Sequence, residues 1–83
     1  MSSYRPTRFA IGDRVIVANW KGADTPTTGM NGYYGHVVEV HPIADWVDVS
    51  LMGRVGAEAR PHDLDPDGND PWPFHADEVE HAD

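Results

Sequence analysis

Hydrophobic and polar residues alternate most clearly over residues 46–51. Val47, Val49 and Leu51 would face one side of a strand, while tryptophan, aspartate and serine occupy the positions between them. A period of two residues is the signature of a half-buried β-strand. We therefore expect a strand here that ends in a tight turn at residues 52–54, followed by a fourth strand over residues 55–59.

Two earlier stretches also have the character of strands. In residues 14–18, Val15 and Val17 share one face, whereas Ile16 lies on the other with an alanine. A strand that is apolar on both faces suits a closed or covered sheet. Residues 34–41, rich in valine, form the next expected strand, which a proline ends.

Glycine and proline divide the rest of the chain into loops. Residues 19–31 contain two glycines and a proline and are expected to form a long loop. Residues 43–45 make a short hairpin connection. Residues 61–73 contain four prolines with aspartate and glycine, which excludes a continuous helix. Residues 74–78 could form one helical turn, and Val79 would begin a last short strand.

The glycine and valine positions near the start of the chain resemble a known motif. They match the KOW-type opening of translation-protein-like, Src homology 3-like small β-barrels, at Gly12-Asp13-x-Val15-x-Val17 and Gly32-x-x-Gly35-x-Val37-x-x-Val40. Residues 73–80 are similar to the single 3₁₀ turn and closing strand of such barrels. The resemblance implies an all-β fold: one five-stranded Src homology 3-like barrel over residues 9–80. A flexible arm at 1–8 and a tail at 81–83 would flank it.

The length and composition restrict the class of protein. Eighty-three residues make one small domain, and the absence of cysteine excludes disulfides and thiolate metal sites. No apolar stretch approaches the ~20 residues that cross a bilayer. We expect a cytoplasmic protein that does not contact membranes, with an oligomeric state that the sequence leaves open. Five arginines to one lysine, and ten aspartates to four glutamates, suit a GC-rich genome such as that of an actinobacterium or its phage.

The net charge of −8 is concentrated at the C-terminal end. Residues 1–60 carry six basic and six acidic side chains, whereas residues 61–83 carry eight acids and neither lysine nor arginine. Acidic surfaces disfavour phosphate backbones and favour basic protein surfaces. The expected partner is therefore another protein with a basic or methylated surface, and nucleic acid is disfavoured.

The motif also departs from its nucleic-acid-binding relatives. Where KOW domains that bind RNA carry lysine and arginine around the second glycine, this chain has Tyr33, Tyr34 and His36. A nucleic-acid-associated module remains an alternative, and its phosphate contacts would come from four arginines: Arg5, Arg8, Arg14 and Arg54. Two further alternatives are an acidic decoy that mimics nucleic acid and an accessory subunit that pairs through a sheet edge.

An aspartate-rich stretch is the sharpest chemical pattern. Asp63, Asp65 and Asp67 precede a glycine in the order D-x-D-x-D-G, which opens an EF-hand-type calcium loop. The twelfth position, where such loops have a glutamate, is Phe74. We therefore expect a solvated turn and no cofactor, with calcium as the alternative. Nucleophilic catalysis lacks cysteine and, outside the N-terminal arm, has only Ser50, so we expect no catalytic residue.

Aromatic residues at loop and strand ends are the remaining candidates for function. We expect Tyr33 and Tyr34 to be exposed, and Trp46 or Trp72 to pack inside. Exposed aromatics beside acids can hold a peptide or a methylated lysine. The predicted function is a non-enzymatic protein-interaction module. Its predicted contacts are Trp20, Tyr33, Tyr34, Trp46, Asp63, Asp65, Asp67 and Asp70.

Overall fold

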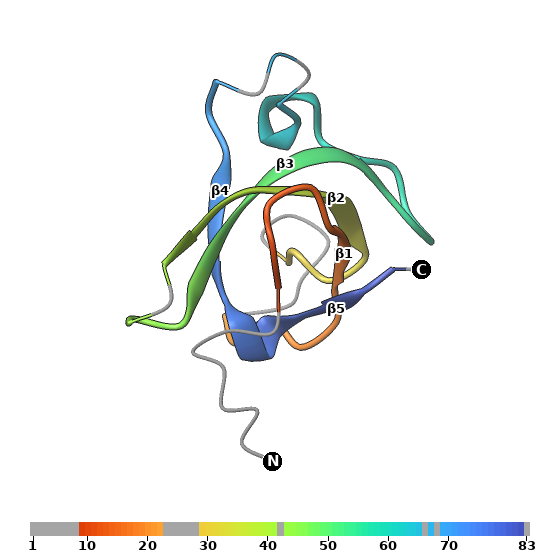
Figure 1. Cartoon of the computed structure of the whole chain (residues 1–83). Coiled ribbons are helices and arrows are strands. Elements are labelled where there is room, and N and C mark those ends of the chain that lie inside the picture. The colour runs from red at the N-terminus through yellow and green to blue at the C-terminus, as the bar shows by residue number, and fades with distance from the viewer. Residues whose placement is uncertain (1–8, 23–28, 42, 66, 68, 83) are drawn as a thin grey trace.

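A computed structural model describes residues 9–22, 29–41, 43–65, 67 and 69–82. The expected N-terminal arm lies outside the described residues. Five strands and two short 3₁₀ helices follow one another along the chain (Figure 1). They are β1 (Arg14–Val17), β2 (Tyr33–His41), β3 (Trp46–Arg54), η1 (Pro61–Asp63), β4 (Trp72–His75), η2 (Ala76–Glu78) and β5 (Val79–His81).

The strands form one antiparallel sheet in the order β4-β3-β2-β1-β5. The nine-residue strands β2 and β3 occupy its centre, and their pairing is interrupted by bulges at Tyr34/Gly35 and Val37/Glu39. Bulges bend a strand and increase its twist, which agrees with the curved course of both strands in Figure 1. The all-β class and the five antiparallel strands thus agree with the prediction, and β4 and β5 form the two edges of the sheet.

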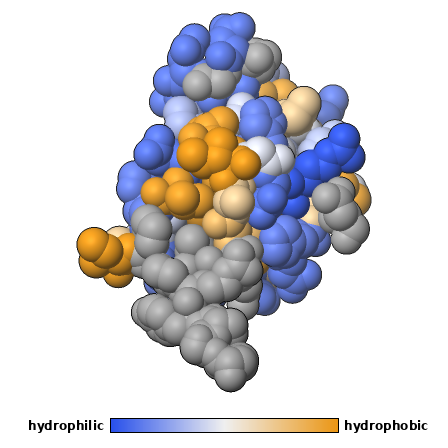
Figure 2. Space-filling model, viewed as in Figure 1, coloured by the Kyte–Doolittle hydropathy of each residue, from blue (hydrophilic) through white to orange (hydrophobic). Residues whose placement is uncertain are grey.

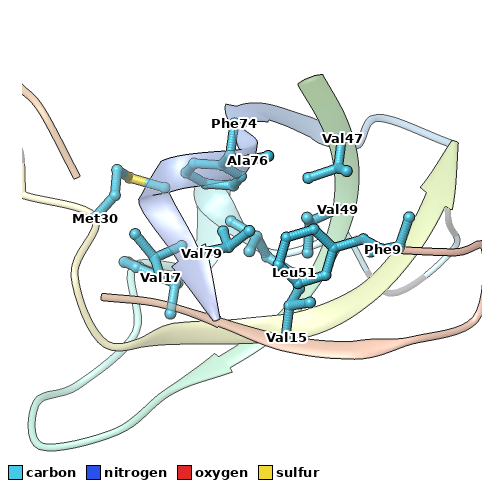
Figure 3. Packing of buried hydrophobic residues seen from close by; sticks show 12 residues of the cluster. Phe9, Val15, Val17, Met30, Val47, Val49, Leu51, Phe74, Ala76 and Val79 are labelled. Atoms are coloured by element: carbon cyan, nitrogen blue, oxygen red, sulfur yellow. The ribbon is translucent and has the colours of Figure 1, made fainter. Parts of the chain in front are cut away.

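A single hydrophobic core lies inside the curved sheet (Figure 3). Every strand contributes to it, as the alternation of residues 46–51 predicted for β3. The connections add Phe9, Met30 and Ala76. The strands supply the other buried hydrophobic residues, which are Val15, Val17, Tyr33, Val37, Val47, Val49, Leu51, Phe74 and Val79.

The turn expected at residues 52–54 and the fourth strand expected at 55–59 are wrong. β3 continues through residues 52–54, because Tyr33 of β2 pairs with Arg54 and Tyr34 pairs with Gly53. The chain bends only at residues 55–57, where Gly56 has a φ of +85°. The sequence pattern missed this because glycine reads as a break, whereas here it lies within a paired strand.

The fourth strand is formed instead by β4, within and after the segment expected to be an acidic loop. Its Pro73 pairs with Asp48 of β3, and β4 has no strand on its other side among the described residues. Proline is tolerated on an edge strand because its missing N–H group faces away from the sheet. Residues 61–63 of the same expected loop form η1.

The last part of the chain agrees with the prediction of a single turn before a closing strand. Glu78 of η2 is buried, and its two carboxylate oxygens accept the backbone N–H groups of His75 at 2.8 Å and Lys21 at 2.9 Å. Its own carbonyl oxygen accepts from residues 18 and 19. β5 then pairs with β1 and includes His81, which we expected in the terminal tail. None of the helices among the described residues is long and apolar enough to span a membrane.

Candidate functional site

The structure does not bring the predicted partner-binding residues onto one surface. Tyr33 has an exposed fraction of 0%, and Asp63 and Asp65 are also buried. The exposure expected for Tyr33 and the solvated state expected for Asp63 and Asp65 are therefore wrong. Alternation along β2 explains the first error, because Tyr33 faces the core when Tyr34 faces outward.

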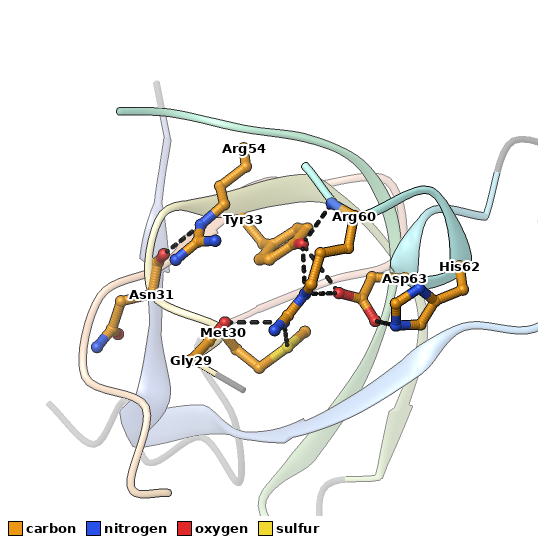
Figure 4. Close-up of polar contacts among 8 residues, drawn as sticks. All are labelled: Gly29, Met30, Asn31, Tyr33, Arg54, Arg60, His62 and Asp63. Atoms are coloured by element: carbon orange, nitrogen blue, oxygen red, sulfur yellow. Dashed lines mark hydrogen bonds and ion pairs between the residues drawn. The ribbon is translucent and has the colours of Figure 1, made fainter. Parts of the chain in front are cut away.

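Tyr33 and Asp63 belong to a buried polar network organised by Arg60 (Figure 4). The Tyr33 hydroxyl donates to Asp63 Oδ2 at 2.9 Å and accepts from the backbone N–H of Arg60 at 2.9 Å. The Arg60 Nε–H donates to the same hydroxyl at 3.2 Å and also to the Asp63 carboxylate. Each buried oxygen therefore has a partner, as burial of polar groups requires.

The same guanidinium joins the network to the long loop. Arg60 Nη2 donates to the carbonyl oxygen of Gly29 at 2.9 Å and contacts Met30 Sδ at 3.3 Å. Burial lowers the pKa of Arg60, but the hydrogen bonds to Tyr33 and Asp63 and the charge of Asp63 raise the pKa by more, so it lies above its ordinary value. Because the pKa of Arg60 is raised in the folded protein, its charge contributes full stability below the ordinary pKa of arginine, and this contribution is lost only as the pH rises through the raised pKa. At neutral pH, the network therefore connects β2, η1 and the end of the long loop through a charged Arg60.

The aspartate-rich loop folds around Asp65. One Asp65 oxygen accepts the backbone N–H of Asn69 at 2.9 Å, and the other accepts that of Asp70 at 3.0 Å. The Asp65 carboxylate thus takes the place of backbone acceptors for the N–H groups of residues 69 and 70. Asp63 and Asp65 are thus directed to separate protein donors, and within the described part of the chain the two do not gather with Asp67 as ligands for calcium. Asp67 and Asp70 are exposed.

The two predicted tryptophans lie in separate regions. Trp20 is half-buried against the core and borders a polar hollow of about 700 Å³ that also includes Lys21 and Asp77. Trp46 has an exposed fraction of 39%, so it does not pack inside, whereas Trp72 is partly buried against the core. The Trp46 ring meets that of His75 edge-on, with centroids 5.6 Å apart.

Beside Trp46 lies a cluster of metal-ligating side chains that the sequence pattern did not indicate. Single ligand atoms of Asp45, His75 and Asp77 lie within 4.8 Å of one another. The residues come from the β2–β3 turn and from the β4–η2 junction, which are distant in sequence. Two carboxylates and an imidazole could hold a divalent cation, but Asp77 is exposed and no further observation points to an ion.

Tyr34 borders a groove on the outer side of the sheet. The groove has a volume of about 860 Å³ and a mainly apolar surface. Its lining joins β1, β2, the end of β3 and the end of β5, the last two of which lie on the right of Figure 1. The lining residues are Gly12, Arg14, Val15, Ile16, Tyr34, Gly35, His36, Met52, Val55, His81 and Ala82.

The sheet register explains how these side chains meet. Ile16 of β1 lies opposite Tyr34 of β2, and Arg14 lies opposite His36. Residues directly opposite one another in an antiparallel pair share a face, so all four project toward the groove. The Tyr34 ring extends over Gly53, where an added Cβ would lie 2.4 Å from the Tyr34 hydroxyl oxygen. Because Gly53 has no side chain, the Tyr34 ring can lie directly over its backbone.

Two hydrophobic side chains at the edge of the groove are strongly exposed. Met52 and Val55 each have an exposed fraction of 60%. Elsewhere the tip of the β2–β3 hairpin forms a hydrophobic protrusion, visible at the left of Figure 2, and Ile43 in that tip is fully exposed. Contiguous exposed apolar surface in a groove indicates an interaction site more strongly than a single protruding side chain does.

Of the predicted site residues, only Tyr34 lies in this groove. Among the other lining residues, the sequence indicated Ile16, because the second apolar face of residues 14–18 places this side chain away from Val15 and Val17. The pattern did not indicate Met52, which it places in a turn at residues 52–54, or Val55, which it places in a separate fourth strand over residues 55–59. His81 was assigned to the tail.

The arginines proposed for nucleic-acid binding are not gathered among the described residues. Arg14 lines the groove, whereas Arg54 packs over the Tyr33 ring at 5.1 Å and donates to the Asn31 carbonyl oxygen. Arg5 and Arg8 lie outside the described residues. A scan of protein-family models and searches of curated proteins and solved structures found no match to the chain. The functional interpretation therefore depends on the groove itself.

Proposed function

We propose that this chain is a non-enzymatic protein-interaction module with the architecture of a Src homology 3-like barrel. It binds a short segment of a partner protein in the groove on the outer side of β1 and β2. The five antiparallel strands and the 3₁₀ turn before β5 support the fold assignment. The observation that carries the function is the apolar groove bordered by Tyr34, Met52 and Val55.

The dimensions of the groove favour a short segment as its occupant. Its volume of about 860 Å³ lies within the ~300–1,000 Å³ of sites that enclose small ligands. A few side chains fill such a space, whereas a folded domain would need a broader surface. The floor and edges are built from paired strands, so the groove is formed before binding and little ordering of the module opposes association.

A non-enzymatic function agrees with the position of Ser50. Its hydroxyl is buried and donates to the backbone carbonyl oxygen of Asp65 at 3.0 Å. A catalytic serine needs a base within hydrogen-bonding distance and access to the substrate. Ser50 instead fastens the segment that follows η1 to β3, where the Asp65 N–H also donates to the Leu51 carbonyl oxygen.

An unbiased peptide selection tests the proposal. Random peptides displayed on phage are selected on the full chain, and the affinities of the selected peptides are then measured for variants. We expect the double variant Met52→Ser/Val55→Ser to weaken binding at least about tenfold, because burying the apolar surface of two hydrophobic side chains contributes more than the ~1.4 kcal/mol to which a tenfold change corresponds.

The chain offers a matched control for that experiment. Ile11 and Ile43 have exposed fractions of 65% and 103% and do not line the groove. The double variant Ile11→Ser/Ile43→Ser removes a similar amount of exposed apolar surface and is expected to leave peptide affinity unchanged. Equal losses in both double variants, or a selection that yields no binder, would contradict a binding site in the groove.

A further inference from the structure

The groove differs in charge from the molecule that carries it. The whole chain has 14 acidic and six basic side chains, yet among the described residues no acid lines the groove. Arg14, His36 and His81 are its charged or chargeable lining residues. The net charge of the chain favours basic partners, whereas the described lining of this groove favours an acidic group.

Arg14 is available to a partner. It is exposed, and within the described part of the chain its guanidinium has no hydrogen bond or ion pair. Arg54 and Arg60, by contrast, are bonded to backbone carbonyl groups and packed against the Tyr33 ring. Arginine presents a planar fork of donors that matches a carboxylate in a bidentate arrangement.

Two acids among the described residues lie near the groove without being part of its lining. Asp13 Oδ2 lies 3.2 Å from His81 Nε2 and also accepts the backbone N–H of Ala10 at 2.9 Å. Glu80 of β5 lies opposite Ile16 and therefore shares its face of the sheet, but it is not part of the lining. Asp13 therefore pairs with the histidine at one end of the groove, while Arg14 has no acidic partner among the described residues.

We propose that the groove recognises a short peptide segment in which a hydrophobic side chain lies next to an aspartate or glutamate. This inference rests on the function proposed above and specifies the partner. The hydrophobic side chain packs against Tyr34, Met52 and Val55, and the carboxylate binds the Arg14 guanidinium. A partner chosen by the net charge of −8 would be basic instead.

Local contacts decide between these partners at moderate ionic strength. At about 0.15 M salt, charges more than ~8 Å apart are largely screened. The acids of the C-terminal region beyond that distance then repel an acidic peptide only weakly. A carboxylate in direct contact with Arg14 is screened much less, because solvent and ions are displaced from the pair.

Two probe peptides of equal length test the proposal by fluorescence anisotropy at this salt concentration and neutral pH. They are rhodamine-labelled Gly-Leu-Asp-Leu-Asp-Gly and Gly-Leu-Lys-Leu-Lys-Gly, both amidated. We expect the full chain to bind the acidic peptide at least about tenfold more tightly than the basic one. The variant Arg14→Glu should reverse that preference, and Arg14→Gln should weaken the acidic peptide without favouring the basic one.

Lys21 supplies the matched charge control. It is exposed and lies outside the groove, so Lys21→Glu changes the net charge by the same amount as Arg14→Glu. We expect it to alter neither affinity by more than about twofold. Equal weakening by the two variants would show general electrostatics and would overturn the role of Arg14.

The remaining outcomes separate this inference from the proposed function. Tighter binding of the basic peptide, with sensitivity to Met52→Ser/Val55→Ser, would overturn the acidic partner and still support the groove as an interaction site. Binding of neither peptide would also overturn the acidic partner, while the phage selection decides independently whether the groove binds peptides. Binding of the acidic peptide that is lost in Arg14→Glu and kept in Lys21→Glu supports the proposal.

Discussion

Tyr33 and Tyr34 are adjacent in β2, yet the Tyr33 side chain is buried in the core and the Tyr34 side chain is exposed. The Tyr33 ring is buried under Arg54 and Arg60, and its hydroxyl holds the N–H of Arg60 and the carboxylate of Asp63. Tyr34, with an exposed fraction of 39%, borders the groove. The pleat of the strand causes this division, because neighbouring side chains point to opposite faces. One tyrosine therefore stabilises the fold and the other is available to a partner.

The buried tyrosine gives a stability prediction. Tyr33→Phe removes a hydroxyl that bonds two charged groups, the Asp63 carboxylate and the Arg60 guanidinium, and the backbone N–H of Arg60, and each loses that partner in a buried site. We expect the free energy of unfolding, measured by urea denaturation, to fall by about 2 kcal/mol. Tyr34→Phe is the matched control and should change it by less than about 0.5 kcal/mol. A similar small change in both variants would show that the hydroxyl of Tyr33 is dispensable.

At the scale of the strands, two glycines determine how β2 and β3 come together. At Gly35 an added Cβ would lie 1.9 Å from the backbone oxygen of Ser50, on the paired strand. At Gly53 the nearest atom is instead the hydroxyl oxygen of Tyr34, at the end of a side chain that can move. Gly35 is thus needed because the backbone of β3 passes too close for any side chain at this bulge. Gly53 instead leaves space for the Tyr34 ring.

A pair of glycine substitutions distinguishes the two situations. We expect Gly35→Ala to lower the free energy of unfolding by more than about 2 kcal/mol, because the backbone of β3 must shift. Gly53→Ala should cost about 1 kcal/mol or less, since the Tyr34 ring can rotate away. Thermal and urea denaturation measure both values. Equal costs would contradict the distinction between a backbone and a side-chain obstacle.

At the scale of the whole molecule, the position of a strand in the sheet should determine its local stability. β2 and β3 are nine residues long and are paired on both sides, whereas β5 has three residues and, within the described part of the chain, pairs with β1 alone. Short edge strands bury few contacts and open more easily than central ones. The groove is therefore bordered on one side by a weaker element, β5, and on the other by the stable centre of the sheet.

Amide hydrogen exchange followed by NMR tests this order. We expect the hydrogen-bonded amides of β2 and β3 to exchange at least about tenfold more slowly than those of β5, which corresponds to ~1.4 kcal/mol in opening free energy. Uniform protection across all five strands would instead mean that the sheet opens only as one cooperative unit.

Charge is also distributed unevenly at this scale. The C-terminal 23 residues contain the excess of acids, but Asp63, Asp65 and Glu78 are buried and bonded within the protein. Those carboxylates hold η1, the following loop and η2 in place, so they do not present a surface to a partner. The net charge therefore overstates the acidity of the surface that this region presents, and the described lining of the groove holds Arg14 and no acid.

The sequence alone determined the all-β class, the strand of Val15 and Val17, the alternation of Val47, Val49 and Leu51, and the turn before the closing strand. These features depend on local spacing, which repeats with the pleat and is readable without contacts. Local spacing also placed Ile16 on the face away from the core. It did not reveal that this face belongs to a groove.

Only the tertiary structure decided which polar and aromatic residues are buried and which are available. Arg60 and Asp63 meet Tyr33 from nearly thirty positions away, and Gly53 continues a strand because Tyr34 of β2 pairs with it. Similarly, Met52, Val55 and His81 line the same groove as Tyr34 because four strands, β3, β2, β1 and β5, pair in that order. Contacts between distant segments depend on register, bulges and backbone approach, which no local pattern encodes. The interaction groove is for that reason a property of the folded sheet, although each of its residues is visible in the sequence.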